Sequence, residues 1–210
     1  MTLAADLEQL LDGLAGRVRQ EAALPGAAGD LAGFADRVAA LRGAPAPAAS
    51  SAPLLVCRHW PAALDALGAA WAGPLAALAP ALPWAQNPNY RQAPPDPGFL
   101  DDYGYAVIAG PAAGPPALIA CETLALGVLL LGPGTHYPLH SHPAVELYVT
   151  LSGDGQWWRD AGPWRDVPPD RVIHHASLVP HATRAGARPL LAIYLWRGEL
   201  ARHARLVGAS

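Results

Sequence analysis

Apolar residues near the start of the chain recur every three or four positions, which is the period of one face of an α-helix. The first such run stops before Pro25-Gly26, a pair that ends helices. A second run follows it, with Asp30 in the N-cap position and Gly43 as the expected terminator. We predict two amphipathic helices, whose apolar positions are Leu3, Leu7, Leu10, Leu14 and Val18 in the first and Leu31, Phe34, Val38 and Leu41 in the second.

The segment after the second helix has a different composition. Residues 43–53 read GAPAPAASSAP, which is typical of a linker or an extended surface segment. Residues 60–78 then favour helix again, with Pro61 in the first turn, where proline is tolerated. We expect Pro74 to kink or break this helix, because proline lacks the N–H that a helix interior needs.

From Tyr103 onward the period changes to short apolar or alternating runs separated by glycine and proline. Such runs are typical of strands in an all-β sandwich or barrel. We therefore predict a mainly β protein in which a helical extension, residues 1–100, packs on an antiparallel β-barrel, residues 101–210. The runs that predict strands are GYAVIAG, ALIA, TLALGVLLLG, VELYVTLSG, RVIHH and PLLAIYLW.

Charge and composition exclude several classes of protein. The formal net charge is −3, with 17 acidic and 14 basic residues, so nothing favours nucleic-acid binding. Asp6 and Glu8 interrupt the N-terminus where a secretory signal would be apolar, and no uncharged run is long enough for a membrane span of about 18 residues. Cys57 and Cys121 lie far apart and outside any paired spacing, so we expect free, buried thiols and a cytoplasmic protein.

Histidines concentrate in the barrel segment. In a strand, side chains alternate between faces, so His140 and His142 project the same way, and Glu146 and Tyr148 share a face further along. A glutamate inside a barrel is costly unless it is paired, and two imidazoles with a carboxylate around a divalent cation remove that cost. We predict a metal site at these residues, with a fourth ligand from a later strand, either His181 or one of the alternates His174 and His175.

The same segment resembles the first signature of the cupin superfamily, G-x5-H-x-H-x3-E-x6-G, and matches it at Gly134, His140, His142, Glu146 and Gly153. The resemblance implies a jelly-roll-like antiparallel cupin barrel and selects His181 as the fourth metal ligand. The second cupin signature, P-x-G-x2-H, is matched less well. Ala176 and Leu178 stand where that signature has proline and glycine.

The barrel half as a whole is similar to the cupin-type dimethylsulfoniopropionate lyases, on the segments YGYAVIAGP, HYPLHSHPAVELYVTLSG, PHAT and YLWRG. NPNY, from Asn87 to Tyr90, is compatible with that family. The resemblance implies β-elimination, in which a base removes the proton next to the substrate carboxylate, and dimethyl sulfide leaves to give acrylate. It also implies that Tyr137 and Tyr148 act as metal-proximal ligand and proton acceptor, with Tyr137 slightly preferred as the base.

A cationic sulfonium is the leaving group in that reaction, and aromatic faces attract cations. Trp196 and Tyr194 share one face of the last long strand, so we expect them to bind the substrate. The ligand set suits iron, manganese, zinc, nickel or cobalt alike. The expected partner is a small carboxylate substrate, with no nucleic acid and no membrane, for a monomer or homodimer.

The fold also hosts other functions. The alternatives are a cupin of the same family that acts on another small carboxylate, a cupin dioxygenase or isomerase with the same ligand set, and a non-catalytic cupin that binds a small ligand. Oxygen consumption would distinguish a dioxygenase from a lyase.

Overall fold

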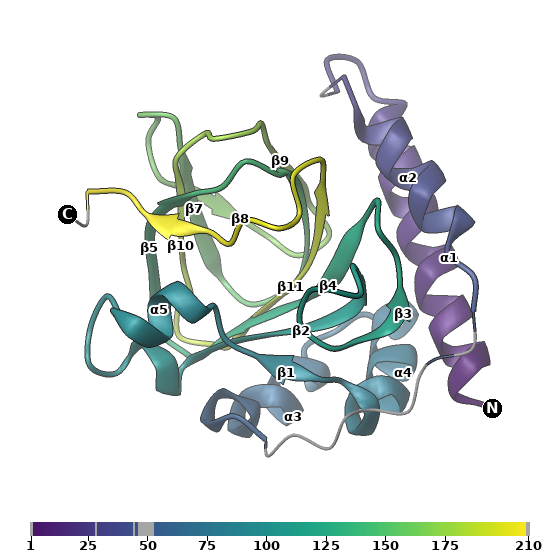
Figure 1. Cartoon of the computed structure of the whole chain (residues 1–210), viewed down its shortest axis with the longest axis horizontal. Coiled ribbons are helices and arrows are strands. Elements are labelled where there is room, and N and C mark those ends of the chain that lie inside the picture. Colours follow the sequence, from purple (N-terminus) through teal and green to yellow (C-terminus); the bar gives the residue numbers. More distant parts are fainter. Residues whose placement is uncertain (1, 28, 44, 46–52, 209–210) are drawn as a thin grey trace.

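The computed structural model describes residues 2–27, 29–43, 45 and 53–208. Helices dominate the first hundred residues and strands the remainder (Figure 1). Most of the predicted linker, residues 43–53, lies outside the described residues. The helices are α1 (Leu3–Ala22), α2 (Leu31–Ala40), η1 (Leu55–His59), α3 (Trp60–Asp65), α4 (Ala69–Leu78), η2 (Ala79–Ala81), α5 (Pro88–Gln92) and η3 (Phe99–Asp101).

The strands form two sheets. In the larger sheet the order is β1-β2-β4-β11-β6-β9, with β3 pairing β2 in parallel, and in the smaller sheet it is β12-β5-β10-β7-β8. All other pairings are antiparallel, which confirms the predicted mainly β fold with a cupin barrel and a helical N-terminal region. The strands are β1 (Trp84–Ala85), β2 (Tyr103–Gly110), β3 (Ala117–Ala120), β4 (Ala125–Leu131), β5 (His136–Ser141), β6 (Val145–Ser152), β7 (Gly155–Arg159), β8 (Arg165–Val167), β9 (Val172–His175), β10 (His181–Arg184), β11 (Leu190–Arg197) and β12 (Arg205–Leu206).

The buried side chains form two hydrophobic cores, one on each face of the larger sheet. One face of β4, β6 and β11 packs against the helices, through side chains such as Val128, Leu147 and Ile193. The other face lines the barrel interior, where Leu129 and Tyr148 belong to a second, aromatic-rich cluster. Successive side chains of a strand point to opposite faces. When every second residue packs against the helices, the residues between them therefore point into the barrel.

The helices differ from their predicted bounds in two places. The second helix ends at Ala40, with Leu41 already extended, so Gly43 does not terminate it, and the Asp30 side chain forms an ion pair with Arg197 rather than a capping hydrogen bond. Residues 60–78 form two helices instead of one, and the break falls just before Ala69, where Gly68 is the N-cap. Pro74 lies inside α4 without ending it.

The cysteines and the hydropathy of the helices were also predicted from the sequence. Cys57 and Cys121 are free thiols, as predicted, but both are only partly buried. No helix in the described part of the chain is both long enough and apolar enough to cross a membrane.

Candidate metal centre and active site

The four predicted metal ligands lie together inside the barrel, but they come from both sheets. His140 belongs to β5 and His181 to β10, and the two residues are direct partners in that antiparallel ladder. Glu146 belongs to β6 of the other sheet, and His142 lies in the turn between. The sequence interpretation treated this segment as one strand, which was wrong. The chain changes sheets after His142. Because the two sheets face each other, the side chains meet between them. Each of the four is at most 2% exposed.

Backbone carbonyl groups fix the orientation of three imidazoles. Nδ1 of His140 lies 2.7 Å from the Pro138 carbonyl oxygen, Nδ1 of His142 lies 2.9 Å from that of Ala144, and Nδ1 of His181 lies 2.9 Å from that of Val179. A carbonyl oxygen only accepts, so each Nδ1 carries the proton and donates it. Nε2 is therefore the nitrogen that each ring would offer to a metal ion, and this is the arrangement that metal-binding histidines show.

Glu146 lies at the centre of the cluster. Its Oε2 atom is 3.1 Å from Nε2 of His142 and 3.1 Å from Nε2 of His181, although the second contact lacks hydrogen-bond geometry. Its Oε1 atom accepts a 2.6 Å hydrogen bond from the indole N–H of Trp196. Burial alone would raise the pKa of Glu146, but the neighbouring His142 and His181 rings outweigh it and hold that pKa well below its usual range. The carboxylate is therefore ionised.

The geometry fits a metal ion. The ligand nitrogens of His140, His142 and His181 lie within 4.8 Å of one another. Two nitrogens on opposite sides of one ion are separated by about 4 Å, twice the usual metal–nitrogen distance. Burial lowers the pKa of His140 well below its usual value, and the neighbouring His181 lowers it further, so this imidazole is neutral and able to coordinate. A group of histidines is thus positioned to bind a metal.

A further histidine, His175, joins this cluster. It was considered from the sequence only as an alternate ligand or a surface residue, yet it is 1% exposed and its ring stacks on that of His181 at 4.1 Å between centroids. Its Cα atom pairs with that of Glu146 across β6 and β9. Strand alternation could have distinguished it from the half-buried His174, but the pairing with Glu146 could not be read from the sequence.

Both predicted tyrosines lie beside the ligands. The ring of Tyr137 stacks on His140 at 3.9 Å, and its hydroxyl group lies 3.2 Å from that of Tyr90. Tyr148 follows Glu146 on the same face of β6. Burial raises the pKa of both Tyr137 and Tyr148 well above the usual value, and the negative charge of Glu146 raises that of Tyr148 further. Neither hydroxyl is a base at neutral pH without a positive charge beside it.

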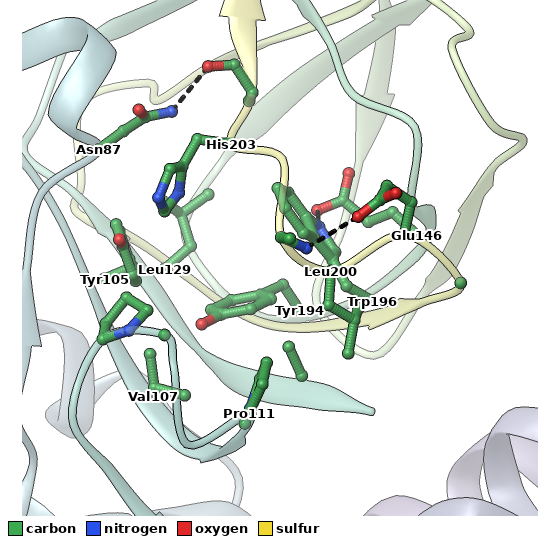
Figure 2. Close-up of a pocket in the computed structure, with 18 of the residues that line it drawn as sticks. Asn87, Tyr105, Val107, Pro111, Leu129, Glu146, Tyr194, Trp196, Leu200 and His203 are labelled. Atoms are coloured by element: carbon green, nitrogen blue, oxygen red, sulfur yellow. Dashed lines mark hydrogen bonds between the residues drawn. The ribbon is translucent and has the colours of Figure 1, made fainter. Parts of the chain in front are cut away.

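A cavity of about 410 Å³ leads to this cluster. Figure 2 shows Glu146 and Trp196 at one end and His203, Tyr105 and Asn87 at the other. Glu146, Tyr137 and Tyr148 line it, whereas the clustered histidines do not, so the carboxylate lies between the cavity and the imidazoles. Tyr194 and Trp196 both form part of its wall, and each faces a site residue across the β6–β11 ladder: Tyr194 pairs with Tyr148 and Trp196 with Glu146.

The charges around the cavity are acidic. Glu122, Glu146 and Glu199 line it, and no arginine does among the described residues. Arg184 instead stacks over Trp164, away from the cavity. His203 also lines the cavity, together with neighbouring residues of the segment 198–204. The carbonyl of Ala204 accepts hydrogen bonds of 2.9 Å from the side chains of Asn87 and Asn89, which hold this segment in place.

The turn before His181 shows how the chain folds at the second cupin signature without its glycine. Leu178, in the glycine position of that signature, has a φ of 63°, a left-handed conformation that glycine adopts easily and leucine does not. Its N–H donates to the carbonyl of His142 at 2.9 Å. The turn before His181 therefore keeps a backbone conformation that glycine would favour.

Comparison with known proteins identifies the family of the chain. A family model described as dimethylsulfoniopropionate lyase matches residues 35–192. Among curated proteins, the chain is 37% identical over 102 residues to the dimethylsulfoniopropionate lyase DddQ of Ruegeria pomeroyi, covering 49% of each chain. It is 31% identical over 126 residues to the putative dimethylsulfoniopropionate lyase DddL of Cereibacter sphaeroides, covering 60% of this chain and 50% of that one. The chain thus spans about half the length of the curated relatives that it matches.

Solved structures extend the similarity beyond the barrel. The crystal structure of DddQ from Ruegeria pomeroyi aligns with a TM-score of 0.69 at 25% identity, covering 95% of this chain and 96% of that chain. A structure from a study of the lyases RdDddP and RnDddQII aligns with a TM-score of 0.71 at 23% identity over 98% of this chain and all of the other, and supports the fold alone. With a match to the family model across most of its length, the chain belongs to the dimethylsulfoniopropionate lyase family.

Proposed function

We propose that the protein is a metal-dependent lyase that cleaves dimethylsulfoniopropionate into dimethyl sulfide and acrylate by β-elimination. The observation that carries this proposal is the charge of the cavity. Its walls are aromatic and its ionisable groups largely acidic, and arginine is absent from its described lining. Such a cavity suits the cationic sulfonium end of the substrate. The described lining offers no arginine to the carboxylate end of the same substrate. Family membership supports the choice of substrate.

Each end of this substrate has a matching surface. A sulfonium cation gains about 0.5 to 2 kcal/mol from each aromatic face that it contacts, and Trp196 and Tyr194 offer such faces beside Glu146. We propose His140, His142, Glu146 and His181 as the ligands of one divalent transition metal ion, which when bound would act as a Lewis acid for the substrate carboxylate and favour the tyrosinate form of a nearby tyrosine. Iron, manganese, zinc, nickel and cobalt all suit this mixed set.

The two tyrosines differ in their surroundings, and the difference favours Tyr148 as the base. The hydroxyl group of Tyr137 is shared with that of Tyr90, whereas the Tyr148 hydroxyl is close enough to the Glu146 carboxylate for that charge to raise its pKa. The Tyr148 hydroxyl therefore lies beside a carboxylate that we propose as a metal ligand. In the reaction its phenolate oxygen takes the proton from the carbon next to the carboxylate. The electrons of that C–H bond form the double bond of acrylate, and the carbon–sulfur bond breaks with its electron pair going to sulfur.

The test is release of dimethyl sulfide. Purified protein loaded with each candidate metal is incubated with dimethylsulfoniopropionate, and headspace gas chromatography measures dimethyl sulfide while acrylate is quantified in solution. Wild type should release both in equal amounts, and His142→Ala should lose the activity. Tyr148→Phe should keep the metal and lose turnover, whereas Tyr137→Phe should retain measurable turnover. If Tyr137→Phe instead abolishes turnover while Tyr148→Phe does not, the two roles are exchanged.

Other outcomes would reject the proposal. Fully metallated wild type that releases no dimethyl sulfide excludes this substrate. Oxygen consumption with a small carboxylate would favour a cupin dioxygenase, and binding without turnover would favour a ligand-binding cupin. The cytoplasmic location and the monomeric or homodimeric state expected from the sequence stay predictions.

A further inference from the structure

His175 lies inside the metal-binding cluster without any of the contacts that hold the other histidines. It is at the end of β9, directly opposite Glu146 on β6, so the two side chains leave adjacent strands on the same face. Its ring lies nearly parallel to that of His181, at an interplanar angle of 10°. The next residue back, His174, is only half-buried and alternates to the other face.

Both ring nitrogens of His175 are buried and have no hydrogen-bond partner among the described residues. A buried polar group without a partner costs about 1 to 3 kcal/mol, and this ring has two. His140, His142 and His181 avoid part of that cost, because a backbone carbonyl accepts from each Nδ1. Packing alone gives no reason for an imidazole at position 175, where an apolar ring of similar size would lack this cost.

A second set of potential ligands includes this residue. One ligand atom each from Glu146, His175 and His181 lies within 4.8 Å of the other two. We call these three residues the His175 set, and His140, His142 and His181 the His140 set. Two imidazoles and one carboxylate are a complete protein ligand set for several divalent transition metals, with further positions left open.

We propose that the His175 set is a second metal position that overlaps the first, so that the cluster can hold one ion in either of two places. The proposal rests on the metal centre of the proposed function. Because the Nε2 lone pair of His181 binds a single ion, the two positions exclude each other. Coordination would also give one His175 nitrogen the partner that it otherwise lacks.

The experiment removes the two sets separately. Metal-free full-length protein is titrated with Co²⁺ by isothermal calorimetry, and the visible absorption of bound Co²⁺ reports its coordination. The variants are the pair His140→Ala/His142→Ala, which leaves only the His175 set, His175→Phe, the triple variant that combines them, and His174→Ala as the control on the opposite face of β9. Phenylalanine keeps a ring at position 175 to stack on His181, and circular dichroism with thermal melting confirms that each variant is folded.

The expected result is asymmetric. The His140→Ala/His142→Ala variant should still bind Co²⁺ at one equivalent, more weakly than wild type and with an altered visible spectrum, because the His175 set remains. Adding His175→Phe should then abolish equimolar binding, and His174→Ala should match wild type throughout. Should the paired variant fail to fold, His140→Phe/His142→Phe, which keeps a ring at both positions, takes its place.

Three results would overturn the inference: wild type that binds no Co²⁺, a folded His140→Ala/His142→Ala variant that binds none, or a triple variant that binds as well as that pair alone. The dimethyl sulfide assay separates this question from the proposed function. Wild type that cleaves the substrate, while the triple variant binds metal like the His140→Ala/His142→Ala variant, would reject the second position and leave the lyase intact.

Discussion

The hydrogen bond from Trp196 to Glu146 allows a metal-binding prediction whose size follows from the structure. The indole N–H of Trp196 donates to Oε1 of Glu146 at 2.6 Å, and Glu146 is 1% exposed. Trp196→Phe removes this donor but keeps an aromatic ring beside His142, whose centroid lies 4.1 Å from that of Trp196. The substitution therefore tests the hydrogen bond with little change to the cavity wall.

The magnitude can be estimated in two ways. A hydrogen bond to a charged group contributes about 1.5 to 3 kcal/mol, which corresponds to about 10- to 150-fold in an equilibrium constant. Loss of a group that orients a metal ligand typically weakens metal binding by about 10- to 100-fold. The two ranges overlap, so we expect Trp196→Phe to raise the dissociation constant for the metal by about 10- to 100-fold.

The assay is competition with a chromophoric chelator of known affinity, on wild type, Trp196→Phe and Trp60→Phe. Trp60 is the matched control because it is also a buried tryptophan, in α3, and its N–H has no partner among the described residues. Trp60→Phe should leave metal affinity unchanged. A dissociation constant for Trp196→Phe within about twofold of wild type would show that Glu146 does not need this donor, and would refute the reasoning.

Three further predictions concern stability. Leu178→Gly should stabilise the protein by about 0.5 kcal/mol. Relief of the left-handed φ gains about 1 to 2 kcal/mol, which exceeds the entropic cost of glycine, about 0.5 to 1 kcal/mol, and little packing is lost because Leu178 is 61% exposed. Thermal melting should show a rise of about 1 to 2 °C, and a lower Tm would contradict this. Burial raises the pKa of Tyr105 to about 12 and those of Tyr103 and Tyr194 well above their usual value, so these hydroxyls stay protonated in the folded state while the unfolded chain ionises near pH 10. These tyrosines should thus leave the stability of metal-free protein unchanged below about pH 10 and lower it as the pH rises beyond that value, and urea unfolding that is equally stable at pH 9 and pH 11 would disprove the assignment. Removal of the metal by a chelator should lower the Tm by about 8 to 16 °C when the ion had been present at about 1,000 times its dissociation constant, and calorimetry with and without Zn²⁺ checks this.

The apolar runs of the sequence predicted strands of the larger sheet and the apolar faces of α1 and α2, because hydrophobic period is a local property that tertiary packing reinforces. None of those runs corresponds to a strand of the smaller sheet. Helix ends were less accurate. The ion pair between Asp30 and Arg197 links residues far apart in the chain, so a local capping rule missed it. The break before Ala69 depends on Gly68, whereas Pro74, the stronger local signal, is accommodated inside α4.

At the site, residue types and spacing identified the cluster, but not how the chain builds it. The change of sheet after His142 and the pairing of Glu146 with His175 are properties of sheet order, which alternation within one strand does not contain. Likewise, the sequence did not indicate His203 as a cavity residue, since the hydrogen bonds from Asn87 and Asn89 to the Ala204 carbonyl join segments far apart in the chain.

The division of the ligands between the two sheets has a mechanical consequence. An ion held by Glu146 from β6 together with His140 and His181 from β5 and β10 would be a cross-link between the walls of the barrel, made after the chain has folded and removable without breaking a covalent bond. The same ion would then set both the chemistry of the cavity and the freedom of its walls to separate. Hydrogen exchange of the amides in these three strands should slow on metal addition, whereas that of α1 on the far side of the larger sheet should not.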